Sequence, residues 1–143
     1  MDFNNGTFIA LGTAGIVLFV TFLVAVFYKP KKRLKVVAKF NPTNNHLVEV
    51  HVKNVGKRRV KTVAPYVKFT HGQISRKYQV NPRKINCKFP RILNIGDEVS
   101  FQINLTNFHS VLEQKSMNTT HLKVIIENMV GMQYNSQSLN YKF

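Results

Sequence analysis

The pattern of hydrophobic and polar positions changes once along the chain, near residue 30. Residues 8–28, FIALGTAGIVLFVTFLVAVFY, include no charged side chain and are mostly apolar. A helix of this length would extend roughly 32 Å, which is enough to cross the hydrocarbon core of a bilayer. After Pro30 the continuous run is replaced by segments in which apolar and polar residues alternate. The pattern therefore predicts a transmembrane helix over 8–28, followed by a separate domain rich in β-strands.

Alternation with a period of two predicts the strands of that domain. Val48, Val50 and Val52 alternate with polar residues, and the same pattern continues from Val99 to Leu105. Other segments with strand character lie at 34–40, 59–70 with an interruption at Pro65, 75–80, 85–89, 122–128 and 133–141. Residues 107–115 predict one or two helical turns, with Asn107 as the N-cap. Seven or eight short strands at regular spacing are typical of a β-sandwich.

One of these segments also carries a resemblance to a known family. Residues 48–56, VEVHVKNVG, resemble the second strand and turn of immunoglobulin-like β-sandwich modules, particularly the adhesion-related type of prokaryotic proteins. The resemblance implies an all-β fold, an Ig-like antiparallel sandwich over 36–143 preceded by the helix. It implies no particular activity, because such folds host many functions.

The positive charge is concentrated in the middle of the chain. The formal net charge is +15, and residues 29–91 hold eighteen Lys and Arg residues against the single acid Glu49. Five of the basic residues form a juxtamembrane tract over 29–35: Lys29, Lys31, Lys32, Arg33 and Lys35. Because basic flanks remain on the cytoplasmic side, residues 1–7 are expected outside and the domain in the cytoplasm.

Two basic turns are expected near the bilayer. If successive strands alternate in direction, the turns at 54–59 and 81–84 lie at the membrane end, and those at 41–45, 70–73, 90–97 and 129–132 lie at the far end. The two membrane-end turns contain Lys57, Arg58, Arg59, Arg83 and Lys84. Together with the juxtamembrane tract, these residues are predicted to contact an anionic lipid surface.

The predicted helix also has a surface suited to pairing with another helix. Ala10 and Ala14, and then Thr21 and Ala25, form two pairs of small residues that would allow a second helix to approach closely.

Candidate catalytic chemistry is scarce in the sequence. His46 and His51 are five residues apart, a separation that places them on opposite faces of a strand, and His71, His109 and His121 have no cysteine or carboxylate at the spacing of metal ligands. The single cysteine, Cys87, excludes an internal disulfide. We therefore predict a non-enzymatic protein with no cofactor, no metal site and no small-molecule substrate. The leading hypothesis is an accessory or scaffold subunit of a membrane complex, and the alternatives are a module docked on anionic lipid and a membrane-tethered nucleic-acid-binding domain.

Overall fold

The computed structural model describes residues 15–23, 33–117 and 119–142, which belong to two separate compact units. In the first unit, residues 15–23 form a helix in which the Thr21 hydroxyl donates a hydrogen bond to the Val17 carbonyl at 2.8 Å. Within the described residues, no helix has the length and apolar character needed to span a bilayer. The rest of the predicted 8–28 span lies outside those residues, as do Ala10, Ala14 and Ala25 of the predicted pairing surface.

The second unit is mostly antiparallel β-structure with short helical segments. Its strands are β1 (Leu34–Phe40), β2 (Leu47–Asn54), β3 (Val60–Thr62), β4 (Tyr66–His71), β5 (Ile74–Gln79), β6 (Arg91–Leu93), β7 (Glu98–Asn104), β8 (Thr119–Glu127), β9 (Gln133–Asn135) and β10 (Leu139–Lys142). The helical segments are the 3₁₀ helices η1 (Pro82–Lys84) and η2 (Leu105–Phe108) and the α-helix α2 (His109–Gln114).

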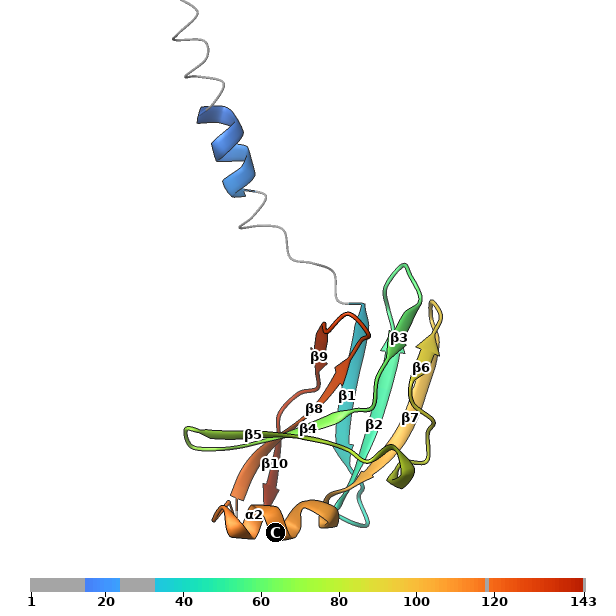
Figure 1. Ribbon diagram of the computed structural model, residues 1–143, viewed down its shortest axis with the longest axis vertical. Helices are drawn as coiled ribbons and strands as arrows, with labels where there is room; N and C mark the ends of the chain where they lie inside the picture. Colours follow the sequence, from blue (N-terminus) through green and yellow to red (C-terminus); the bar gives the residue numbers. More distant parts are fainter. Residues whose placement is uncertain (1–14, 24–32, 118, 143) are drawn as a thin grey trace, which may run out of the picture. The chain divides into compact units, whose positions relative to one another are not determined.

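The strands form three sheets, as Figure 1 shows. The first has the order β1-β2-β7, and the second has the order β10-β8-β4-β5 with β9 also paired to β8. The third contains only β3 and β6. All pairings are antiparallel, and β1 is in register with β2 from Leu34 opposite Asn54 to Phe40 opposite Val48.

The first two sheets share one hydrophobic core. The predicted valines of β2 are buried there, as are Phe69 of β4 and Phe101 of β7. The helical segment between β7 and β8 covers this core at one end, because Leu112 is buried and the Phe108 ring lies 5.5 Å from that of Phe69. The alternation seen in the sequence thus correctly identifies the inward face of the longest strands.

A glutamine side chain covers the free edge of β1. The chain between β9 and β10 brings Gln137 to β1, where its side-chain amide donates to the Ala38 carbonyl and its oxygen accepts a bond from the Ala38 N–H. Beside it, the Ser136 hydroxyl accepts a bond from the backbone N–H of Val124 at 3.0 Å. An exposed strand edge would leave such groups unpaired, so Gln137 joins the two sheets along this side.

Several sequence predictions about elements are corrected. Residues 85–89 are not a strand; the strand in this region is β6, which pairs with β3. The segment 59–70 is interrupted at Pro65 as expected, but its two halves, β3 and β4, belong to different sheets. The final segment is likewise divided into β9 and β10, because Ser136 and Gln137 bond outside the strand ladder.

The predicted N-cap at Asn107 is also wrong. The helical segment begins earlier, and its cap is Asn104, whose side-chain oxygen accepts a bond from the Thr106 N–H at 2.9 Å. Asn107 instead donates to the Asn104 carbonyl at 3.1 Å and accepts a bond from the Lys84 ammonium at 3.0 Å.

The buried Tyr141 generates a prediction about high pH. Its hydroxyl lies 2.8 Å from Nδ1 of His46 and 2.6 Å from Nε2 of His109, and its side chain is 1% exposed. Burial raises the pKa of Tyr141 from 10.0 to about 12. Tyr141 ionises at lower pH in the unfolded chain than in the folded one, so its stabilising contribution is complete below pH 10 and is lost as the pH approaches 12.

We therefore expect the stability difference between the wild type and Tyr141→Phe to shrink over this range. The unfolding free energy of the wild type minus that of the variant should be smaller near pH 12 than below pH 10, by on the order of 2 kcal/mol. Urea unfolding at a series of pH values measures this quantity directly. A difference that stays constant through pH 12 would show that burial does not hold this phenol neutral.

Candidate functional site

Three turns lie together at the end of the domain where β1 begins, and α2 lies at the opposite end (Figure 1). We call residues 54–59, 94–97 and 128–132 the three-turn end. The backbone N–H groups of Val55 and Gly56 donate to the Arg33 carbonyl at 2.9 and 3.0 Å, which fixes the first turn beside the point where the chain enters β1. The second turn is bonded to the first, because the Gly96 N–H donates to the Asn54 carbonyl at 3.0 Å.

The third turn is connected through β3. The Met129 N–H donates to the Lys61 carbonyl at 3.0 Å, and Thr62 forms an isolated bridge with Asn128. Since β3 follows directly from the first turn, backbone hydrogen bonds connect all three turns. Their relative positions are therefore determined by the sheet framework rather than by side-chain packing alone.

A buried asparagine organises the first turn. Asn54 is 1% exposed, and its side-chain NH₂ donates to the carbonyls of Arg58 at 2.9 Å and Leu93 at 3.0 Å. Its side-chain oxygen accepts a bond from the Gly56 N–H at 3.0 Å. One amide thus satisfies three backbone groups at the junction of β2, β6 and the turn between β2 and β3.

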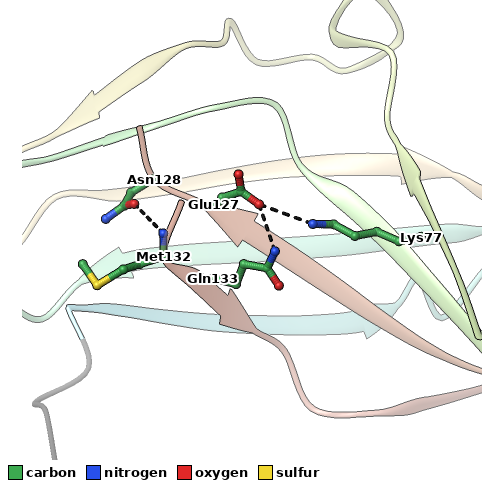
Figure 2. A network of polar contacts seen from close by, with 5 residues as sticks. All are labelled: Lys77, Glu127, Asn128, Met132 and Gln133. Carbon is green, nitrogen blue, oxygen red and sulfur yellow. Dashed lines mark hydrogen bonds and ion pairs between the residues drawn. The ribbon is translucent and has the colours of Figure 1, made fainter. Parts of the chain in front are cut away.

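A second asparagine plays the same role in the third turn, as Figure 2 shows. The Asn128 side-chain oxygen accepts bonds from the N–H groups of Val130 at 3.1 Å and Met132 at 2.8 Å. Next to it, Glu127 accepts bonds from the Lys77 ammonium at 3.3 Å and the Gln133 amide at 3.0 Å (Figure 2). These contacts hold the backbone of the turn and leave the side chain of Val130 exposed.

The second turn is closed by an aspartate. The Asp97 carboxylate accepts a bond from the Asn94 N–H at 2.8 Å, and the Asp97 N–H donates to the Asn94 carbonyl at 3.1 Å. Gly96 has a φ of +81°, a conformation that glycine adopts without the strain of a Cβ atom. The side chain of the intervening Ile95 is left 65% exposed.

Exposed apolar side chains are concentrated at this end. In the described part of the second unit, seven large apolar side chains are exposed, and six of them belong to the three-turn end or to the adjoining strand β6. These six are Val55, Ile92, Ile95, Met129, Val130 and Met132, and the seventh is Ile74. The most exposed is Val130, at 77%. Contiguous exposed apolar surface is a feature of the sites where proteins contact partners or membranes.

Basic side chains surround these apolar tips. Lys57, Arg58 and Arg59 follow Val55 and Gly56 in the first turn and are exposed. Lys35 and Lys61 are exposed on the strands that begin beside this turn. The acids at this end are Asp97, which closes its own turn, Glu98, whose carboxylate lies 3.9 Å from the Lys53 ammonium, and Glu127, whose carboxylate lies 3.3 Å from the Lys77 ammonium. The electrostatic potential at this end is therefore expected to be positive.

The remaining predicted contact residues lie elsewhere. Arg83 and Lys84 are in η1, and the Lys84–Asn107 bond places this segment beside η2, which follows the opposite end of β7. Lys29, Lys31 and Lys32 lie outside the described residues.

Within the domain, 54–59 lies at the end where β1 begins, as the alternation of strand directions predicted, and 81–84 does not. Residues 94–97 and 129–132 share the end of 54–59, although they were expected at the other end. Contact of this end with a membrane remains a prediction. The alternation argument counted 59–70 and 85–89 as strands that each cross the whole domain, but the first divides between two sheets and the second is not a strand. The exposed apolar tips were not predicted. The signal that could have identified them is the recurrence of Asn, one or two apolar residues and Gly in the three turns: NVG, NIG and NMVG.

Comparisons with known proteins add little to this description. No protein-family model matches the chain, and no curated protein matches it. Among solved structures, a Bordetella pertussis protein assigned as ApaA is 8% identical, with a TM-score of 0.39 over 76% of this chain and 88% of that chain. A likeness this distant supports no argument about the function of this chain.

The role of Asn54 can be tested by substitution. Replacing Asn54 by alanine removes three hydrogen bonds and leaves two buried carbonyl groups without this donor. We expect the unfolding free energy to fall by about 2–4 kcal/mol. The control is Asn45→Ala in the exposed turn between β1 and β2, which should change stability by less than about 0.5 kcal/mol. Equal stability of the two variants in urea unfolding would contradict this role.

Proposed function

We propose that this chain is a non-enzymatic, single-pass membrane protein whose cytoplasmic domain docks by its three-turn end on the anionic leaflet of the bilayer. The observation that carries the proposal is the combination of exposed apolar tips with surrounding basic residues at the end where the chain enters β1. The apolar run over 8–28 supports an anchor, because its length and composition suit a bilayer.

The chemistry of the three-turn end suits a lipid interface better than a purely aqueous contact. Membrane-surface segments combine apolar side chains, which enter the boundary between headgroups and acyl chains, with Lys and Arg that attract anionic lipid. Val55 and Lys57 lie within one turn in this arrangement. Each basic residue near an anionic leaflet contributes about 1 kcal/mol.

Tethering lowers the affinity that docking requires. A domain joined to its anchor by a short linker experiences the surface at an effective concentration on the order of millimolar. A dissociation constant of about 1 mM corresponds to about 4 kcal/mol, which is close to what Lys57, Arg58, Arg59 and Lys61 supply together at about 1 kcal/mol each. Burial of the apolar tips adds to this, so docking needs no further contact.

The finer fold assignment also belongs to this proposal. We assign the domain to the immunoglobulin-like β-sandwiches. The sheet orders β1-β2-β7 and β10-β8-β4-β5 around one core support this assignment, as does the helical crossing between β7 and β8. In such sandwiches the turns gather at the two ends, which is how the three-turn end can face a membrane while the opposite end remains in solution.

The two other functional hypotheses remain predictions. An accessory subunit of a membrane complex would use the same three-turn end against a protein, and a nucleic-acid binder would use its positive charge alone. Exposed Ile95 and Val130 favour the bilayer over nucleic acid, because an apolar tip gains nothing from a phosphate backbone.

Docking can be measured with a single tryptophan, because the chain has none. We expect the full chain carrying Val130→Trp, reconstituted in vesicles with anionic lipid, to show blue-shifted fluorescence that brominated lipids quench. The control is Thr43→Trp, in the exposed turn at the opposite end, whose emission should remain that of a solvated indole. Equal quenching of the two would rule out docking through the three-turn end.

The basic residues can be tested with the same fluorescence reporter. Reversing the charge at Lys57, Arg58 and Arg59 should lower the ratio of docked to undocked protein by roughly a hundredfold or more. The matched control reverses Arg83, Lys84 and Lys115, which carry the same total charge away from the three-turn end. A different outcome is that both triple variants still dock, but only when a co-purified membrane protein is present. This result would favour the accessory-subunit hypothesis instead.

A further inference from the structure

Two histidines converge on one buried oxygen at the end of the domain opposite the three-turn end. Nδ1 of His46 lies 2.8 Å from the Tyr141 hydroxyl, and Nε2 of His109 lies 2.6 Å from the same atom. The centres of the two imidazole rings are 5.0 Å apart, with their planes inclined at 73°. Two ring nitrogens and one phenol oxygen are therefore brought together within hydrogen-bond distance.

The three residues come from three different elements. His46 precedes β2, His109 is the first residue of α2, and Tyr141 lies in β10. Phe40 of β1 stacks on the Tyr141 ring at a centroid distance of 6.0 Å and helps to fix its orientation. The two imidazoles are half-buried, so solvent and small ions can reach them, whereas the phenol is buried.

The separation of the rings fits coordination of one metal ion. With zinc–nitrogen bonds of about 2.1 Å at a tetrahedral angle, the centres of two bound imidazole rings lie roughly 5 Å apart. The observed separation is 5.0 Å. The donor atoms of such a site lie roughly 3.3 Å apart. The tyrosine oxygen, now 2.8 Å from Nδ1 of His46 and 2.6 Å from Nε2 of His109, would therefore need to move away from them by about 0.5 Å and about 0.7 Å.

We propose that His46, His109 and Tyr141 form a binding site for a divalent transition-metal ion of the zinc type. His46 coordinates through Nδ1 and His109 through Nε2, each as a neutral imidazole with its proton on the other ring nitrogen. Tyr141 supplies its oxygen and releases its hydroxyl proton to solvent when the ion binds, because the charge of the ion outweighs the effect of burial. Solvent completes the shell. Bonds to the ion replace the two hydrogen bonds to Tyr141. They link the turn before β2, the start of α2 and β10.

Within the described residues, no group of three or more His, Cys, Asp and Glu side chains is arranged to hold a metal. The phenol oxygen is the third donor that distinguishes this cluster from a pair of histidines. The site lies away from the three-turn end, so it is independent of membrane docking, and either proposal can fail without the other.

The test is zinc titration of the untagged full chain in detergent micelles, followed by isothermal calorimetry. We expect one saturable Zn²⁺ per chain and a rise in melting temperature with Zn²⁺ concentration, because an ion that binds only the folded state stabilises it. His46→Gln and His109→Gln should each weaken binding by at least about tenfold, and Tyr141→Phe should weaken it while leaving the aromatic packing intact.

His51→Gln and His121→Gln are the matched controls. His51 lies on β2, where its Nδ1 is 2.7 Å from the Ser100 hydroxyl of β7, and His121 is exposed on β8. Neither belongs to the cluster. Circular dichroism confirms that each variant is folded, and the visible spectrum of bound Co²⁺ reports tetrahedral coordination. The absence of saturable zinc binding, or zinc binding that survives His46→Gln and His109→Gln but is lost in the controls, would overturn the proposal.

Discussion

The buried side-chain amide of Asn54 is the contact on which the first two turns of the three-turn end depend. It lies at the last position of β2 and satisfies backbone groups of its own turn and of β6. The backbone of Asn54 also bonds the last two residues of the second turn, since its N–H donates to the Asp97 carbonyl at 2.9 Å and its carbonyl accepts from the Gly96 N–H at 3.0 Å. A hydrophobic residue here would leave several buried polar groups unpaired, which is costly in a protein interior.

This constraint explains why apolar side chains stay exposed instead of folding into the core. Val55 and Ile95 each lie between residues whose backbone is held by Asn54 or Asp97, and so they point away from the sheets and remain exposed. The third turn has the same construction around Asn128. The domain thus has two different ends. One presents apolar tips among basic residues, and the other is closed by α2 and the histidine–tyrosine cluster.

Much of the sheet framework could be predicted from the sequence because it depends on local periodicity. The valines of β2 and the alternation across β7 identified both the strands and their buried faces. Periodicity alone did not reveal that Pro65 marks a change of sheet. The buried positions do shift, from Val60 and Thr62 in β3 to Val67 and Phe69 in β4, but a bulge at a proline within one strand would produce the same shift. It also could not locate β6, whose three residues are too few to establish a period.

The candidate site was predictable only in part, for a related reason. The positive charge of Lys57, Arg58 and Arg59 is visible in the sequence, and their turn does lie where β1 begins. Which other turns share that end depends on the sheet order, and so does the meeting of His46 with His109. Such long-range juxtapositions have no signature in the spacing of residues along the chain.

Hydrogen–deuterium exchange of the full chain in lipid nanodiscs tests the central claim, docking through the three-turn end, without any substitution. Exchange is compared between nanodiscs of neutral lipid and nanodiscs containing anionic lipid. The account predicts slower exchange with anionic lipid in the peptides that cover 54–59, 94–97 and 128–132, and no change at 41–45 or 70–73. Unchanged exchange in all three turns, or protection confined to the opposite end, would contradict it.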